Sequence, residues 1–179
     1  MTENENKSTA KPGYDAEQYL QTCISFLNEI GIQTCFEKLE EPCFLPGLSI
    51  RNGTIIIDRE ALSYPGDILH EAGHIAVVAA AERHTLTAAA IEKRENREAE
   101  EMMAIAWSYA ACMHLGLDPY IVFHDDGYKG GGSYIADNFG NKNYFGLPML
   151  QWKGMALDEV NAAKQNLPAY PCMMKWVLE

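Results

Sequence analysis

The chain contains no CxxC pair, and its five cysteines are Cys23, Cys35, Cys43, Cys112 and Cys172. Their spacing excludes a zinc ribbon, which needs pairs of ligands close together in the sequence. An odd and sparse set of cysteines is also unlike the framework of a disulfide-rich secreted domain. We therefore predict free thiols that pack as small apolar side chains in a reducing compartment.

Long hydrophobic runs are also missing. The run IAVVAAA, at residues 75–81, is far too short to cross a bilayer. The first residues, MTENENKSTAKP, lack the basic start and the apolar centre of a secretory signal. We therefore expect a cytoplasmic protein that does not associate with a membrane, and a disordered N-terminal tail over residues 1–13.

Basic residues are scarce, since 14 Lys and Arg stand against 25 Asp and Glu, for a formal net charge of −11. A phosphate backbone repels such a surface, which argues against nucleic acid as a partner. The length of 179 residues and the 47% of hydrophobic residues are typical of one globular domain with a buried core. We expect residues 14–179 to form that single domain.

The first half of the chain alternates helical and extended patterns. Residues 15–30 carry apolar side chains at helical spacing, and Gly31 is placed to end that helix. A strand is expected from Ile32, where β-branched and aromatic residues gather. Two extended arms then flank Asn52 and Gly53 in LSIRNGTIIID, and this pair predicts a two-residue hairpin turn.

The rest of the chain favours helices. One helix is expected to begin near Asp67, a candidate capping residue, after a break made by proline and glycine. A second, residues 97–116, is charged at its start and then apolar nearly all round, as in a buried helix, and Asp118 and Pro119 are expected to end it. Beyond it we expect a glycine-rich loop at 124–134, irregular chain at 140–152, a short helix at 156–167 and an irregular C-terminal stretch.

The stretch ILHEAGHIAV, residues 68–77, is the most informative part of the sequence. On a helix, His70 and His74 lie one turn apart on one face, so both imidazoles can point at one ion. Zinc suits such a site because it accepts nitrogen and oxygen ligands in tetrahedral geometry. Glu71 can then take a proton from a zinc-activated water as the water attacks a carbonyl, which is the metalloprotease arrangement. Gly73 leaves room for another element to approach, and the alternative is an accidental histidine pair on a partly buried helix.

Catalytic zinc needs a third protein ligand. A metzincin-type third histidine would occupy the position of Ala80, which excludes that class, and His84 is expected on the surface. The acidic start of the second helix offers Glu98, Glu100 and Glu101, and an antiparallel helix could bring any one of them to the histidine pair. Helix geometry alone does not choose among the three, and all could instead be first-turn acids favoured by the helix dipole.

With this motif, residues 24–113 resemble the ImmA/IrrE-like regulatory metallopeptidases, a branch of the zincins. The matching order is a helix, a short strand, a hairpin strand reading GTIIID and the ILHEAGH helix. The family carries a glutamate at the head of an alanine-rich helix, with an apolar residue and an alanine four and five places later. Glu101, followed by Ile105 and Ala106, fits that register and lies 27 residues past His74. The resemblance therefore implies Glu101 as the third ligand, with the other two glutamates in reserve.

The resemblance implies an α+β, zincin-like fold, with a small sheet packed on a helix-rich core that holds the HExxH helix and a second ligand-bearing helix. It implies that residues 54–58 form a sheet edge along which a peptide binds as an added strand. The expected activity is hydrolysis of peptide bonds in a restricted protein or peptide substrate. His70, His74 and Glu101 would bind Zn²⁺, and Glu71 would be the general base. The alternatives are an inactive zincin-like domain that serves as a protein-interaction module, and a metal-dependent hydrolase acting on another bond.

Further candidates lie beside the glycine-rich loop. His124 and Tyr128 could supply a proton donor or a hydrogen bond to a developing oxyanion, although an exposed loop histidine is the commoner explanation. Tyr109 and Tyr134 are weaker candidates of the same kind. Residues 130–132, three glycines, lack the GK[ST] ending of a phosphate loop, so nucleotide binding is not supported. The loop is expected to be a mobile flap over the cleft or a plain linker.

Overall fold

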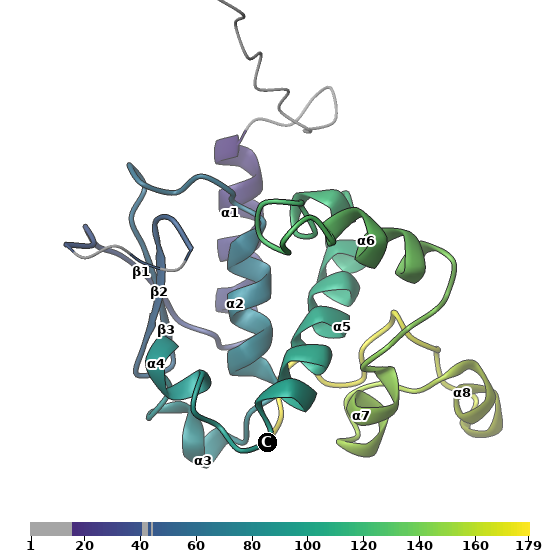
Figure 1. The fold of residues 1–179 in the computed structure, drawn as a ribbon. Helices are drawn as coiled ribbons and strands as arrows, with labels where there is room; N and C mark the ends of the chain where they lie inside the picture. Colours follow the sequence, from purple (N-terminus) through teal and green to yellow (C-terminus); the bar gives the residue numbers. More distant parts are fainter. Residues whose placement is uncertain (1–15, 41–42, 44) are drawn as a thin grey trace, which may run out of the picture.

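The computed structural model describes residues 16–40, 43 and 45–179. Within these residues the chain forms a mixed α+β structure with a small three-stranded sheet and eight α-helices (Figure 1). The sheet lies at the left of the view with short helices below it, longer helices fill the middle, and further short helices lie at the right. The predicted N-terminal tail, residues 1–13, lies outside the described residues.

The sheet consists of β1 (Thr34–Phe36), β2 (Leu48–Arg51) and β3 (Thr54–Ile57), in the spatial order β1-β3-β2. The strand β3 pairs in parallel with β1 and antiparallel with β2. The register joins Thr34 to Ile55 across the first pair and Arg51 to Thr54 across the second. The expected edge position of residues 54–58 was therefore wrong. Because β1 occupies one side of β3 and β2 the other, the outer strands form the edges of this sheet.

The predicted hairpin between β2 and β3 is confirmed. Asn52 has φ 52° and Gly53 has φ 72°, so both turn residues adopt the left-handed backbone that a two-residue hairpin turn demands. Asparagine and glycine tolerate this conformation better than other residues. The dipeptide therefore determines which residues of the two strands face each other.

The first predicted helix is also confirmed, as α1 (Ala16–Glu29), and Gly31 follows it with φ 86°. Its buried side chains are apolar residues at helical spacing: Tyr19, Leu20, Cys23, Ile24, Phe26 and Leu27. The strand expected from Ile32 begins two residues later, at Thr34, and is only three residues long.

The two central helices are α2 (Asp67–Ala76) and α5 (Arg97–Leu115), and they pack side by side. They come close together at Gly73, where an added Cβ would be 2.8 Å from the carbonyl oxygen of Ala104. Further along, the Ser108 hydroxyl lies 3.2 Å from the carbonyl oxygen of Leu69 and donates to it. The expectation that Gly73 admits a close neighbour is confirmed.

The ends of these two helices differ from the predictions. Asp67 is the first helical residue of α2, and the capping position belongs to Gly66, which has no side chain to cap with. The carboxylate of Asp67 instead bonds a histidine from a distant loop. At the other helix, Gly116 ends α5 in the left-handed conformation, before Asp118 and Pro119 are reached. Those two residues begin the short 3-10 turn η1 (Pro119–Ile121).

Five shorter helices complete the described part of the chain: α3 (Ala80–Arg83), α4 (Ala88–Ile91), α6 (Gly132–Gly140), α7 (Leu147–Trp152) and α8 (Glu159–Gln165). The last of these lies within the helix predicted at 156–167. No helix among the described residues has both the length and the apolar character that a membrane span needs.

Two segments expected to lack regular structure contain helices. The irregular chain expected at 140–152 contains α7, and the glycine-rich loop ends early because α6 begins at Gly132. Proline and glycine misled the prediction at α7. Pro148 lies in the first helical turn, where a missing N–H does no harm, and Gly146 precedes the helix with φ 84°.

The C-terminal residues pack without forming a helix, as predicted, and they cross both central helices. The indole Nε1 of Trp107 on α5 donates to the carbonyl oxygen of Trp176 at 2.7 Å. The backbone N–H of Leu178 donates to the carbonyl oxygen of Ala76, the last residue of α2, at 2.8 Å. The end of the chain therefore helps to hold α2 against α5.

Cys23, Cys35, Cys112 and Cys172 form no disulfide, so the prediction of free thiols is confirmed for these four. Their predicted apolar packing holds for Cys23 and Cys112, which are buried. It fails for Cys35 and Cys172, which are exposed.

Candidate metal centre

The two histidines of the HEAGH stretch face one another on α2. Their Nε2 atoms are 3.1 Å apart, and the rings meet edge to face with centroids 4.7 Å apart. Only 13% of the His70 side chain and 9% of the His74 side chain are exposed. The four-residue spacing has placed both nitrogens on one face, as the sequence predicted.

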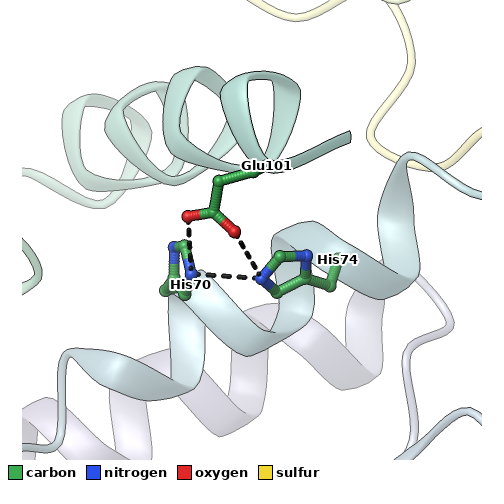
Figure 2. A group of neighbouring side chains, drawn as sticks. All are labelled: His70, His74 and Glu101. Atoms are coloured by element: carbon green, nitrogen blue, oxygen red, sulfur yellow. Dashed lines mark hydrogen bonds and ion pairs between the residues drawn. The ribbon is translucent and has the colours of Figure 1, made fainter. Parts of the chain in front are cut away.

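The helix α5 adds a carboxylate to this pair. Glu101 points from the start of α5 toward both imidazoles, as Figure 2 shows. Its Oε1 lies 3.5 Å from Nε2 of His70, and its Oε2 lies 3.4 Å from Nε2 of His74. The three side chains thus come from two helices that are held in contact at Gly73.

The distances within this group match the demands of a tetrahedral metal site. Zinc binds nitrogen and oxygen at about 2.0–2.1 Å, which places two tetrahedral ligand atoms about 3.3–3.4 Å apart. The two nitrogens are 3.1 Å apart, and each lies 3.4–3.5 Å from a different oxygen of the Glu101 carboxylate, so all three separations lie near that value. Two imidazoles and one carboxylate also form a ligand set that zinc prefers, with one position left for water or substrate. The residues present therefore fit the ion that the sequence implied.

Burial keeps both imidazoles in the neutral form that can bind a metal. Removal from water lowers the pKa of His70 to about 4. The pKa of His74 is lowered to about 3, first by burial and then by the neighbouring His70, while Glu101 acts in the opposite direction. Each neutral imidazole has one nitrogen with a free lone pair, so neither ring has to lose a net proton before a cation binds.

Glu71 lies next to His70 on α2, and the pKa of its carboxyl group is raised to about 8. Burial is the largest cause, and the negative charges of Asp67 and Glu101 add to it. Among the described residues, no hydrogen bond or ion pair engages this carboxyl group. It is therefore available for proton transfer, at a pKa that lies near neutral pH.

The structure separates the three candidate glutamates of α5. Glu101 alone meets the histidine pair. Glu100 points elsewhere and binds Arg94, with carboxylate oxygens 2.6 and 2.9 Å from the guanidinium nitrogens. Glu98 is exposed. His84, which was expected on the surface, is indeed exposed, so it does not complete the group.

The expectation of an exposed histidine at position 124 was wrong. Only 10% of the His124 side chain is exposed, and its Nε2 lies 2.8 Å from a carboxylate oxygen of Asp67. The ring of Tyr64 stacks on His124 with centroids 3.9 Å apart, and the Tyr64 hydroxyl donates to Asp126. Tyr128, the second candidate in this loop, has its hydroxyl 3.0 Å from Nδ1 of His70.

The other two tyrosines do not join the centre. Tyr109 is buried among the aromatic rings of Phe139, Tyr144 and Tyr170, and Tyr134 is 71% exposed on α6. Tyr64 was not considered from the sequence, although it lies directly before the proline that precedes α2. That position, close to the start of the motif helix, is the one feature that could have drawn attention to it.

In comparisons with known proteins, no family model, curated protein or solved structure matches the chain. The chemical reading of the centre therefore rests on its own residues. Two buried neutral imidazoles, one carboxylate and an adjacent acid of raised pKa lie together between α2 and α5.

Proposed function

We propose that the protein is a cytoplasmic, zinc-dependent metallopeptidase with a zincin-like fold, which hydrolyses peptide bonds in a restricted protein or peptide substrate. One observation carries the proposal: two imidazole nitrogens from α2 and the carboxylate of Glu101 from α5 lie 3.1–3.5 Å from one another, beside a carboxyl group of raised pKa. A metal-binding HExxH helix with an acid directly after its first histidine is the arrangement that such hydrolysis needs.

Each residue has a distinct task in this proposal. His70, His74 and Glu101 would hold the ion, which supplies Lewis acidity and activates water near neutral pH. Glu71 would take the proton of the attacking water on a carboxylate oxygen and then give it to the departing amine. Glu71 neighbours His70 on the helix and is not one of the three residues whose possible ligand atoms meet, so it can do this without binding the ion.

The raised pKa of Glu71 agrees with that task. A group that first takes and then gives a proton works best when its pKa lies near the working pH. The value of about 8 arises with the negative charges of Asp67 and Glu101 close by and without a cation. A nearby dication favours the carboxylate and lowers that pKa, which makes Glu71 a base at neutral pH.

The conservative variant Glu71→Gln tests the general-base role. It keeps the size of the side chain and leaves the three ligands in place, so zinc content should equal that of the wild type. Hydrolysis of a peptide library should fall by about 10²–10⁴-fold, the usual contribution of a general base. Glu98→Gln, an exposed change on α5, is the matched control and should leave both properties unchanged.

Equal hydrolysis by Glu71→Gln and the wild type would refute the general-base role. The library should also be tested with and without a chelator, because peptide cleavage that survives the chelator would refute metal dependence. A wild type that binds zinc but cleaves no peptide would instead favour the inactive protein-interaction module. Cleavage of another bond by that zinc-loaded protein would favour the non-peptide hydrolase.

A further inference from the structure

Residues 124–131, in the loop between η1 and α6, lie against the N-terminal half of α2. Two of its side chains bond residues of that helix: His124 bonds Asp67, and Tyr128 bonds His70. Tyr64, which precedes α2, bonds Asp126 of the same loop. The segment expected from the sequence to be a flap or a linker is thus tied to the helix that carries the histidine pair.

His124 fastens the loop through both of its ring nitrogens. Nδ1 accepts the backbone N–H of Gly127 at 3.1 Å, so the ring proton resides on Nε2. Nε2 then donates to the carboxylate of Asp67 at 2.8 Å, and only 10% and 5% of the two side chains are exposed. With both nitrogens engaged, His124 has none left for substrate, and its role is to attach the loop.

The shape of this loop depends on a glycine. A Cβ added at Gly127 would lie 2.9 Å from Cε1 and 3.1 Å from Nε2 of the His124 ring, which is closer than such atoms normally approach. The absence of a side chain therefore lets the Gly127 amide reach the imidazole. This hydrogen bond from the Gly127 amide orients the His124 ring toward Asp67.

Tyr128 reaches the metal centre from the fastened loop. Nε2 of His70 faces His74 and Glu101, so the ring proton of His70 belongs on Nδ1. That N–H donates to the Tyr128 hydroxyl at 3.0 Å, and the two rings meet edge to face. The Tyr128 ring also packs against Phe123, which limits its movement.

We propose that Tyr128 is a positioning residue of the metal centre: its hydroxyl holds His70 with Nε2 directed at the ion, and the bond between His124 and Asp67 keeps Tyr128 in place. This inference rests on the metal centre of the proposed function. A ligand imidazole is commonly oriented by a partner on its other nitrogen, and losing such a partner weakens metal binding by about 10–100-fold. Here that partner comes from a loop 58 residues away along the chain.

The test compares two tyrosine variants by zinc affinity, measured in competition with a chelator of known affinity. Tyr128→Phe removes only the hydroxyl and keeps the ring on Phe123, so zinc should bind about 10–100-fold more weakly. Tyr134→Phe removes an exposed hydroxyl from the neighbouring α6 and should bind zinc as the wild type does. A Tyr128→Phe protein with wild-type zinc affinity would overturn the proposal.

A second pair of variants tests the attachment. His124→Gln retains an N–H that can donate to Asp67, whereas His124→Ala does not. We expect weaker zinc binding in His124→Ala and at least partial recovery in His124→Gln. Equal zinc affinity in His124→Ala and the wild type would overturn the part assigned to His124.

A spectroscopic readout separates positioning from a loss of folding. In the metal-free protein, ¹⁵N shifts of His70 report which nitrogen carries the proton, and the absorption of the cobalt-loaded protein reports ligand geometry. Both should change in Tyr128→Phe while thermal unfolding stays close to the wild type, and unchanged spectra would overturn the proposal. A wild type that binds zinc and cleaves no peptide would refute the peptidase proposal alone.

Discussion

Two histidine–carboxylate groups lie on α2, and they are built differently. In the first, His124 bonds Asp67 at 2.8 Å and the Gly127 amide at 3.1 Å, so each ring nitrogen has one protein partner. In the second, His70 and His74 face Glu101 at 3.5 and 3.4 Å, beyond the usual length of a hydrogen bond. The first group is largely buried, whereas in the second only the two imidazoles are, and 40% of the Glu101 side chain is exposed.

The difference lies in whether the protein's own atoms satisfy every polar atom of the group. In the first group, protein atoms alone supply a hydrogen-bond partner for each ring nitrogen of His124. The group of His70, His74 and Glu101 brings two neutral nitrogens within 3.1 Å of each other, and no proton they carry can satisfy both of them and the carboxylate. A single cation between the three would satisfy all of them, which is why we assign metal binding to this group.

The largest effect is expected from removing the carboxylate of the second group. Glu101→Ala deletes one of three ligands, so its zinc affinity should fall by more than the roughly 100-fold that marks the upper range for outer-sphere partners. Glu98→Ala, one helical turn earlier and exposed, should bind zinc as the wild type does. Chelator competition measures both constants. Equal zinc affinity in Glu101→Ala and the wild type would mean that this group resembles the first one and holds no ion.

The site was predictable from the sequence as far as local spacing determines it. The histidine pair needs only a helix, and the spacing of four residues sets its geometry. Choosing among the glutamates of α5 was harder, because neighbours on a helix point in different directions. The rotation of α5, set by its contact at Gly73, turns Glu101 toward α2 and leaves Glu100 to Arg94.

Tyr128 and His124 were noticed in the sequence, but their partners were not. His124 and Tyr128 follow His70 by 54 and 58 residues (124 − 70 and 128 − 70), and no periodic pattern relates them to it. Their positions depend on how the loop before α6 returns to α2, which is a long-range property of the fold. Sequence reasoning therefore favoured an exposed loop for His124, where the structure has a nearly buried bond.

In the fold, too, the elements with a local sequence pattern were predicted and the long-range pairing was not. The hairpin at Asn52 and Gly53 and the helices α1, α2 and α5 follow from turn chemistry and helical periodicity, and all were expected. The central place of β3 was not expected, because it depends on a parallel partner, β1, that is separated from it in the sequence. Pairing of that kind leaves no local pattern in either strand.

An intermediate effect is expected from a change of pH on the stability of the metal-free protein. The pKa values of His70 and His74 are about 4 and about 3 in the folded state and about 6.5 when unfolded. Below pH 6.5 these two histidines therefore bind protons in the unfolded chain but not in the folded chain. The free energy of unfolding consequently decreases as the pH decreases. Glu71 acts oppositely, since its pKa of about 8 lies above its unfolded value and its contribution is lost as pH rises through 8.

Because two histidines act in one direction and Glu71 alone in the other, the free energy of unfolding should decrease by roughly 1 kcal/mol for each pH unit from pH 6 down to pH 5. Thermal unfolding with a chelator present should show the highest Tm near pH 6–7 and a decline on either side. The double variant His70→Gln/His74→Gln should lose the decline on the acid side, whereas His84→Gln, an exposed change, should keep it. A wild-type Tm that does not fall between pH 6 and pH 5 would show that these imidazoles are not held neutral.

The smallest effect on stability and zinc affinity is expected from Gly73→Ala. This substitution should alter only the group of His70, His74 and Glu101. An alanine favours the helix by about 1 kcal/mol. However, its Cβ would meet backbone atoms of Ala104 at 2.8 and 3.0 Å, and overpacking of this kind costs about 1–3 kcal/mol. The unfolding free energy should therefore fall by about 1 kcal/mol, and zinc affinity should fall because α5 carries Glu101 away from the histidines.

Gly140→Ala is the matched control, because it lies in α6 with no atom within 4 Å of the added Cβ, and it should lose neither stability nor zinc affinity. The bond between His124 and Asp67 does not involve α5, so the ¹⁵N shifts of His124 should remain unchanged in Gly73→Ala. If those shifts moved while zinc affinity stayed at the wild-type value, the dependence on α5 would belong to the first group. The spacing of α2 and α5 would then not be what holds the three ligands together.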